Sequence, residues 1–134
     1  LFRGGNLIAP LRVATNFAVS SEDANPIGME VVAADRRVAG VIKDIWVDRA
    51  ESFIRFYEVA LADGAGDVLM PAPFGLVDRA TRRIQVDALL AHQFVNVPKL
   101  RDPDQVTMFE EEKIAAYYAA GTLYATPARV EPLL

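Results

Sequence analysis

Residues 38–61, which read VAGVIKDIWVDRAESFIRFYEVAL, decide the fold of this chain. The stretch Val38–Asp48 follows a strand pattern, and Ser52–Ala62 follows another. The few residues between them, around 48–51, match the length of a hairpin turn. The sequence therefore predicts a two-stranded β-hairpin. One face of its first strand carries Val38, Gly40, Ile42, Asp44, Trp46 and Asp48.

Shorter strands are expected on both sides of this hairpin. Met29–Ala34 is a short apolar run before it, and turn residues at 63–66 and 78–81 divide the chain after it. The later strands are expected at Asp67–Met70, Leu76–Val77 and Arg82–Asp87, with Pro71 and Pro73 marking a bend or an edge. Turn signals about every 8–12 residues predict a small antiparallel β-barrel or sandwich. They leave no room for crossover helices, so no parallel strand pair is expected in residues 29–90.

The N-terminal segment, residues 1–28, has no clear period. Glycines and prolines interrupt it, and apolar side chains such as Leu7, Ile8 and Leu11 lie between them. This apolar content is too high for a solvated tether. We therefore expect an extended arm that buries these side chains against the barrel or a partner, followed by one domain over residues 29–134.

A C-terminal α-helix is expected at about residues 108–120. Thr107 and Glu110 have the spacing of a capping box, in which each side chain accepts a hydrogen bond from the other residue's backbone N–H. Glu111 and Glu112 add negative charge to the first turn, where the helix dipole favours it. Gly121 is a plausible C-terminal end for this helix.

Composition excludes several classes of site. The chain has 134 residues, a formal net charge of −4, no cysteine and one histidine. Disulfides, thiolate metal sites and multi-histidine metal sites are therefore ruled out, and an acidic chain is a poor candidate for nucleic-acid binding. No apolar run reaches the length of about 18 residues that a membrane helix needs. Because the sequence begins at Leu1 without methionine, we expect it to be part of a longer chain.

Known catalytic motifs are absent, and we expect no catalytic, cofactor-binding or metal-binding residues. His92 lies in an apolar neighbourhood, where a structural or solvent-facing loop residue is the simplest interpretation. The acidic run Glu110–Glu112 fits helix capping better than cation binding. The basic turn residues are most simply solvated, the alternative being contact with a partner's carboxylates or with lipid headgroups. These residues are Arg36, Arg37, Arg79, Arg82 and Arg83.

The hairpin carries the polar cluster of greatest interest, formed by Asp44, Asp48, Glu51 and Arg55. Grouped carboxylates raise one another's pKa, whereas a nearby guanidinium lowers it. Such groups can hold and pass a proton near neutral pH. The alternative is a turn aspartate that accepts hydrogen bonds from its own backbone beside a solvated glutamate. Spacing alone favours this alternative.

Ordered motifs along the chain resemble the cytoplasmic domain of the H subunit of the purple-bacterial photosynthetic reaction centre. The resemblance extends from about Leu7 to Pro127. Its motifs are Asn25–Gly28, Ala39–Gly40, Asp44–Asp48, Glu51, Arg55–Phe56, Glu58–Val59, Leu69–Pro71, Val86, Ala88–Leu89, Val106–Thr107, Glu110–Glu111, Lys113–Ile114 and Gly121.

The resemblance implies a mainly β fold: a small antiparallel PRC-type β-barrel with an extended N-terminal arm and a C-terminal α-helix. It also implies a non-catalytic subunit of a light-driven electron-transfer complex. The family protein caps and stabilises the L and M subunits and supports proton transfer to the secondary quinone. It lies on the cytoplasmic face of the bacterial inner (intracytoplasmic or chromatophore) membrane, anchored by one N-terminal membrane helix that this sequence lacks.

The implied partners are the L and M subunits, with light-harvesting polypeptides and lipid headgroups as further candidates. No cofactor is expected on this chain itself. Bacteriochlorophyll, bacteriopheophytin, quinone and iron are expected in the L and M subunits.

Residue by residue, Asp48 and Glu51 match carboxylates of the family's proton pathway, and Arg55 matches a basic residue beside them. One departure concerns proton uptake, because Arg3 and Gly5 stand where some family members have a pair of surface histidines.

A different class of protein is the alternative: a free PRC-barrel adaptor, similar to the barrel module of ribosome maturation factors, that binds a protein partner and has no redox role. Such an adaptor needs neither an extended arm nor a carboxylate cluster on the hairpin.

Overall fold

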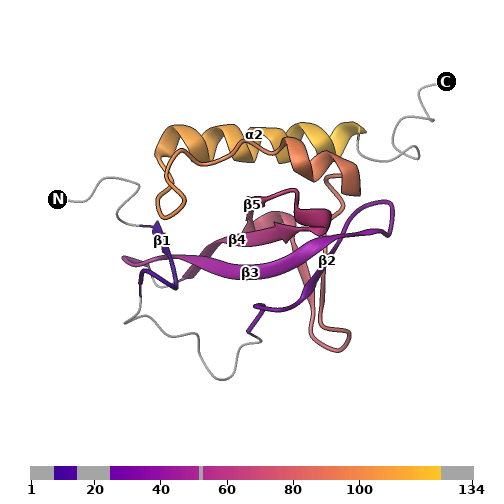
Figure 1. Ribbon diagram of the computed structural model, residues 1–134, viewed down its shortest axis with the longest axis horizontal. Helices are drawn as coiled ribbons and strands as arrows, with labels where there is room; N and C mark the ends of the chain where they lie inside the picture. The colour runs from indigo at the N-terminus through magenta and orange to yellow at the C-terminus, as the bar shows by residue number, and fades with distance from the viewer. Residues whose placement is uncertain (1–7, 15–24, 52, 125–134) are drawn as a thin grey trace.

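A computed structural model describes residues 8–14, 25–51 and 53–124. Within these ranges the chain is mainly β, with one long helix near its C-terminus (Figure 1). The strands are β1 (Ile8–Pro10), β2 (Glu30–Val32), β3 (Val38–Asp48), β4 (Phe53–Leu61), β5 (Asp67–Pro71), β6 (Leu76–Asp78) and β7 (Arg83–Gln85). The helices are α2 (Met108–Tyr124) and the short 3₁₀ segments η1 (Ala62–Gly64), η2 (Ala72–Phe74) and η3 (Ala91–Asn96).

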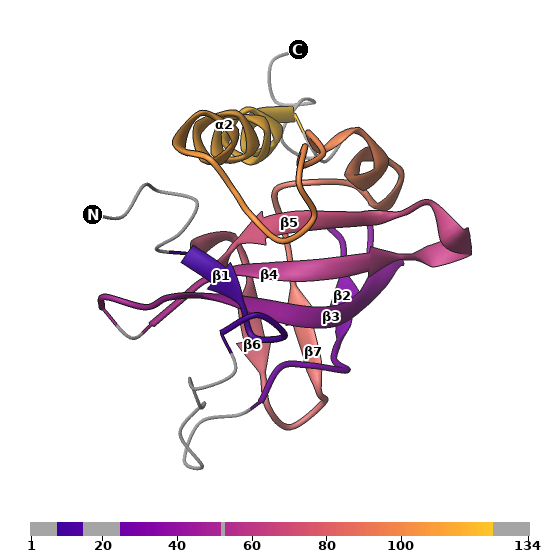
Figure 2. The same cartoon turned by 60° about the vertical axis from the view of Figure 1, so that its left-hand side comes forward.

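The described strands form one sheet in the order β5-β4-β3-β2-β7-β6, and β1 also pairs with β3. β1 and β2 pair with opposite ends of β3, since Ile8 lies opposite Asp48 and Glu30 opposite Val41. This arrangement is visible in Figure 2, where β1 crosses one end of the long β3–β4 ribbon. The predicted hairpin is confirmed, with β3 at the predicted residues.

One expectation about the sheet is wrong, because β2 and β7 pair in parallel. The connection between β2 and β7 consists of strands β3 to β6 and their loops instead of a crossover helix. The curl of the sheet brings β7 back beside β2. The path ends at β5 on one side and β6 on the other, so the sheet is not closed. The fold is thus the expected mainly β domain with a C-terminal helix, built on an open sheet.

Two register shifts interrupt the β3–β4 pairing. Asp44 lies opposite Glu58 while Ile42 lies opposite Val59, so Lys43 is an extra residue on β3. On β4 the extra residue is Arg55, between the pairs Phe56–Trp46 and Ile54–Val47. β-Bulges of this kind redirect side chains locally. Both bulges place a basic side chain beside carboxylates of the same hairpin.

Helix α2 covers the outer edge of β5 (Figures 1 and 2). The fully buried Tyr118 donates a hydrogen bond from its hydroxyl to the carbonyl oxygen of Leu69, 3.0 Å away. Its ring packs edge-on against Phe94 at a centroid distance of 6.1 Å. Burial raises the pKa of the Tyr118 hydroxyl, so this donor stays protonated. The helix therefore protects an edge that would otherwise offer unpaired backbone groups.

The predicted capping box begins α2. The Glu110 N–H donates to Thr107 Oγ1 (3.1 Å), and the Thr107 N–H donates to Glu110 Oε1 (2.9 Å). The predicted end at Gly121 is wrong, because the helix continues to Tyr124. A Cβ at Gly121 would lie 2.5 Å from the carbonyl oxygen of Ala88. This glycine allows close packing of the helix and does not end it.

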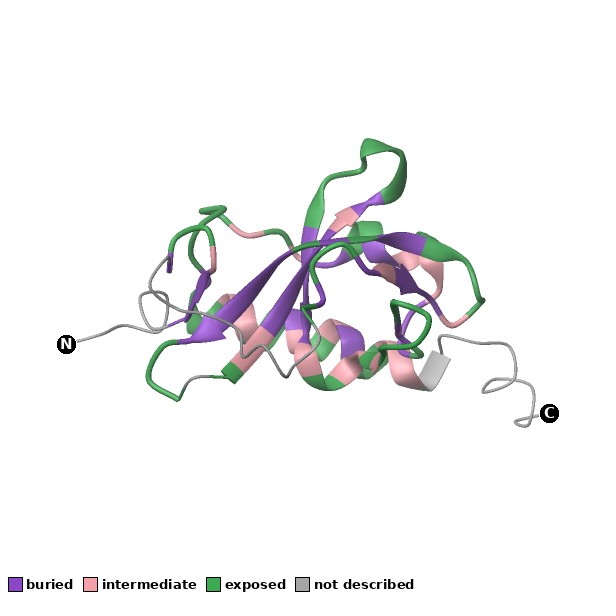
Figure 3. Ribbon diagram, turned by 90° about the horizontal axis from the view of Figure 1, so that it is seen from below, coloured by how far each residue is buried: buried purple, intermediate pink, exposed green. Residues whose placement is uncertain are grey.

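Part of the predicted arm belongs to the sheet. Ile8 and Ala9 on β1 are buried in the core, and Leu11 is partly buried against it. Figure 3 shows that the long strands of the sheet are mostly buried, whereas the connecting loops are mostly exposed. Leu7 lies outside the described residues, and the division of the chain at residue 28 stays a prediction. Among the described residues, no helix combines the length and the apolar character needed to cross a membrane.

Candidate functional site

Asp48 is the centre of the first polar cluster, at the end of β3. It is only 5% exposed. Its Oδ1 accepts hydrogen bonds from the N–H groups of Ala50 (2.9 Å) and Glu51 (3.1 Å), which fix the β3–β4 turn. Its Oδ2 lies 3.3 Å from Arg55 Nη1. Asp48 is therefore both a turn aspartate, as the simpler interpretation held, and the partner of a guanidinium.

Arg55 links this hairpin to helix α2. Its Nη2 lies 3.0 Å from Glu111 Oε1, and its guanidinium stacks over Phe53 at 5.7 Å. Burial raises the pKa of Glu111, and the charges of Asp48 and Glu112 raise it further while Arg55 opposes them. The first cluster therefore holds one carboxyl group whose proton affinity is increased.

Glu51 is exposed in the turn, and its backbone N–H is bound to Asp48. An exposed carboxyl group can exchange protons directly with water. Of the four predicted site residues, the structure brings the side chains of Asp48 and Arg55 into contact, whereas Glu51 is linked to Asp48 only through its backbone N–H. Glu111 was predicted as a first-turn charge of the helix and not as a member of this cluster, because its contact with Arg55 depends on tertiary packing.

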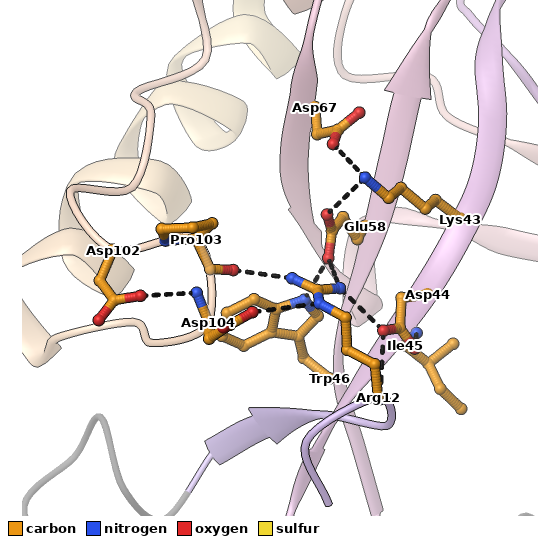
Figure 4. A network of polar contacts seen from close by, with 10 residues as sticks. All are labelled: Arg12, Lys43, Asp44, Ile45, Trp46, Glu58, Asp67, Asp102, Pro103 and Asp104. Atoms are coloured by element: carbon orange, nitrogen blue, oxygen red, sulfur yellow. Dashed lines mark hydrogen bonds and ion pairs between the residues drawn. The ribbon is translucent and has the colours of Figure 1, made fainter.

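Asp44 lies in a second polar cluster, centred on Arg12 (Figure 4). Arg12 Nη1 lies 2.8 Å from both Asp44 Oδ2 and Glu58 Oε1. Its Nε lies 3.1 Å from Asp104 Oδ1, and its Nη2 donates to the carbonyl oxygen of Pro103 (2.8 Å). One guanidinium thus joins two strands to the segment before α2.

Glu58 is the buried side of this second cluster, with 5% exposure. Its Oε1 also accepts a hydrogen bond from the indole N–H of Trp46 (2.9 Å). Lys43 completes the cluster, 3.9 Å from Glu58 Oε2 and 2.6 Å from Asp67 Oδ2. Burial lowers the pKa of Arg12, but hydrogen bonds and charge attraction from Glu58, Asp44 and Asp104 outweigh it and raise the value.

Sequence reasoning did not assign a role to Arg12 or Glu58. Glu58 offered a signal, since it is the one charged residue among residues 56–61 of β4. Arg12 offered none, because its surroundings have no period and its partners are 32 or more positions away along the chain. Only the folded arrangement reveals this cluster.

The other singled-out residues have simpler places. His92 is exposed in η3, in line with a solvent-facing position. Glu110 serves the capping box, and its Oε2 also accepts a hydrogen bond from the Arg101 N–H (2.8 Å). In the basic turns, Arg82 donates to the carbonyl oxygens of Asn25 (3.0 Å) and Ile27 (3.2 Å). Arg82 therefore holds the turn before β2.

These features define a small, mainly β domain with two carboxylate–guanidinium clusters on one hairpin. The family model of the PRC-barrel domain matches residues 19–93, which is more than half of the chain. The chain belongs to the PRC-barrel family.

Proposed function

We propose that this chain is the membrane-extrinsic part of a reaction centre H subunit that caps the L and M subunits and supports proton transfer to the secondary quinone. The observation that carries the proposal is the cluster of Asp48, Arg55 and Glu111 beside the exposed Glu51. Asp48, Glu51 and Arg55 occupy the positions that the resemblance assigns to the proton pathway. Membership of the PRC-barrel family is consistent with this role.

The chemistry of such a relay requires groups that both take up and release protons near the working pH. Glu51 is open to water, whereas Glu111 is partly buried and has a raised pKa. Arg55 bridges Asp48 and Glu111, which limits their mutual repulsion. In the proposed complex, pigments, quinone and iron belong to the L and M subunits, and this chain contributes the titratable groups on the cytoplasmic side.

Glu51→Gln tests the relay, because it keeps the shape of the side chain and removes its titratable proton. In the assembled complex we expect slower proton-coupled second electron transfer to the secondary quinone and unchanged light-driven charge separation, both measured by flash spectroscopy. A small weak acid in the buffer is expected to restore part of the rate. The matched control is Glu30→Gln, a half-buried carboxyl on β2 that lies 3.4 Å from Arg83 Nε and away from the hairpin turn. Equal second-electron rates for wild type and Glu51→Gln across neutral pH would refute the role of Glu51.

A free PRC-barrel adaptor is the competing function. Both polar clusters are linked by ion pairs within the chain, and such pairs could also serve only to hold an adaptor domain together. An adaptor would be recovered with a protein partner that carries no pigment.

A further inference from the structure

The second polar cluster connects three parts of the chain that are distant in sequence. Arg12 follows β1, its partners Asp44 and Glu58 lie on β3 and β4, and Asp104 precedes α2. Four acceptor groups surround one guanidinium, and two of them belong to the segment before the helix (Figure 4). A planar guanidinium with several donors suits such a junction better than any other side chain.

The segment from Arg101 to Thr107 connects the residues that Arg12 contacts to the first turn of α2. The segment turns at Asp102, whose Oδ1 accepts a hydrogen bond from the Asp104 N–H (2.9 Å). The carboxylate of Glu110 accepts hydrogen bonds from both Arg101 and Thr107. Val106 is fully buried in the core. The segment and the first turn of α2 therefore form one hydrogen-bonded unit.

This unit has two guanidinium contacts with the β3–β4 ribbon. Arg12 holds its beginning, and Arg55 holds Glu111 one helical turn into α2. Asp44 and Asp48, which face the two arginines, are four residues apart on β3, or about 13 Å along a strand. Val106, buried between these two contacts, adds an apolar attachment of the unit to the core.

We propose that Arg12 is a positioning residue, which holds the 101–107 segment on the sheet and thereby places Glu111 against Arg55 and Asp48. Glu111 faces Arg55, Asp48 and Glu112, and Arg12 does not contact it. The effect of Arg12 on Glu111 therefore passes through the position of the segment. The consequence for a proton relay rests on the proposed function, whereas the positioning itself does not.

The test is the pH titration of the Glu111 carboxyl carbon by ¹³C NMR in the full chain with Arg12→Met. We expect the midpoint to fall from its raised value toward the usual 4.5 of a solvated glutamate, because the freed segment exposes Glu111 to water. Removal of a positive charge alone would raise the midpoint. The direction of the change therefore separates repositioning from a simple charge effect.

Two companion variants make the result decisive. Arg12→Lys keeps the charge but cannot reach four acceptors, so the same fall in the Glu111 midpoint is expected, and this variant decides the matter if Arg12→Met does not fold. Arg82→Met is the matched control, since it removes an arginine that binds the carbonyl oxygens of Asn25 and Ile27 far along the chain from α2. It is expected to leave Glu111 unchanged.

Trp46, the only tryptophan, reports on the same change. It is fully buried between Arg12 and Glu58, so its fluorescence is expected to shift to longer wavelength in Arg12→Met. An unchanged or raised Glu111 midpoint in a folded Arg12 variant would overturn the positioning role. A lowered midpoint with unchanged second electron transfer in the assembled complex would uphold the positioning and count against the proposed function.

Discussion

Gly121→Ala offers the sharpest check on the packing of α2. In an exposed helix interior, replacing glycine by alanine stabilises a protein by about 1 kcal/mol. At Gly121 the new Cβ would lie 2.5 Å from the carbonyl oxygen of Ala88 and 2.6 Å from Leu89 Cδ2. The leucine tip can rotate, but the backbone oxygen cannot move without displacing the segment before η3.

Forced overpacking of this kind costs about 1–3 kcal/mol, which outweighs the gain in helix propensity. We therefore expect a net loss of about 1 kcal/mol or more, corresponding to a fall of a few degrees in Tm. The assay is urea or thermal unfolding followed by circular dichroism. Ala120→Gly, at an exposed neighbouring position of the helix, measures the propensity effect alone and is expected to cost about 1 kcal/mol. A Gly121→Ala variant that is more stable than wild type would refute the close contact.

Three further predictions concern stability. Thr107→Ala is expected to lower the free energy of unfolding by about 1 kcal/mol, because the Glu110 N–H loses its acceptor, and an unchanged urea midpoint would place the cap elsewhere. Glu111 binds its proton more tightly in the folded state, so its contribution to stability decreases as pH rises from the usual 4.5 through the raised pKa. Glu111→Gln is expected to remove this decrease from a plot of unfolding free energy against pH. Identical plots for the variant and wild type would contradict the prediction. Gly40→Ala places a Cβ 2.2 Å from the Ala60 carbonyl oxygen and is expected to cost about 3 kcal/mol or more, whereas near-native stability would show that β3 and β4 lie farther apart.

Local patterns made the hairpin and the start of the helix predictable. β3 follows the strand pattern of Val38–Asp48, and the Thr107–Glu110 spacing determines the capping box within four residues. Both signals come from neighbouring residues, whose geometry is set by strand alternation and helix capping.

Features that depend on distant residues could not be predicted in this way. The parallel pairing of β2 with β7 arises from the curl of the whole sheet, which no short window records. A glycine at position 121 fits two local interpretations: it can end the helix, or it can let the helix approach another segment closely. The contact with Ala88 decides between the two.

The candidate site was predictable in part for the same reason. Asp48, Glu51 and Arg55 lie within one hairpin, so the turn pairs Arg55 with Asp48 and bonds the Glu51 backbone N–H to the same carboxylate. Asp44 lies on the same strand as Asp48, but the bulge at Lys43 places it opposite Glu58. Its guanidinium partner, Arg12, comes from a distant part of the sequence. A charge cluster assembled from distant segments is visible only after folding.

Affinity purification of the protein from detergent-solubilised cells of its native host tests the central proposal most directly. We predict that an affinity-tagged chain copurifies with the L and M polypeptides and with the near-infrared absorbance of bacteriochlorophyll. Recovery of the chain with a pigment-free protein partner, while the L and M subunits assemble without it, would contradict the proposed role and support the adaptor.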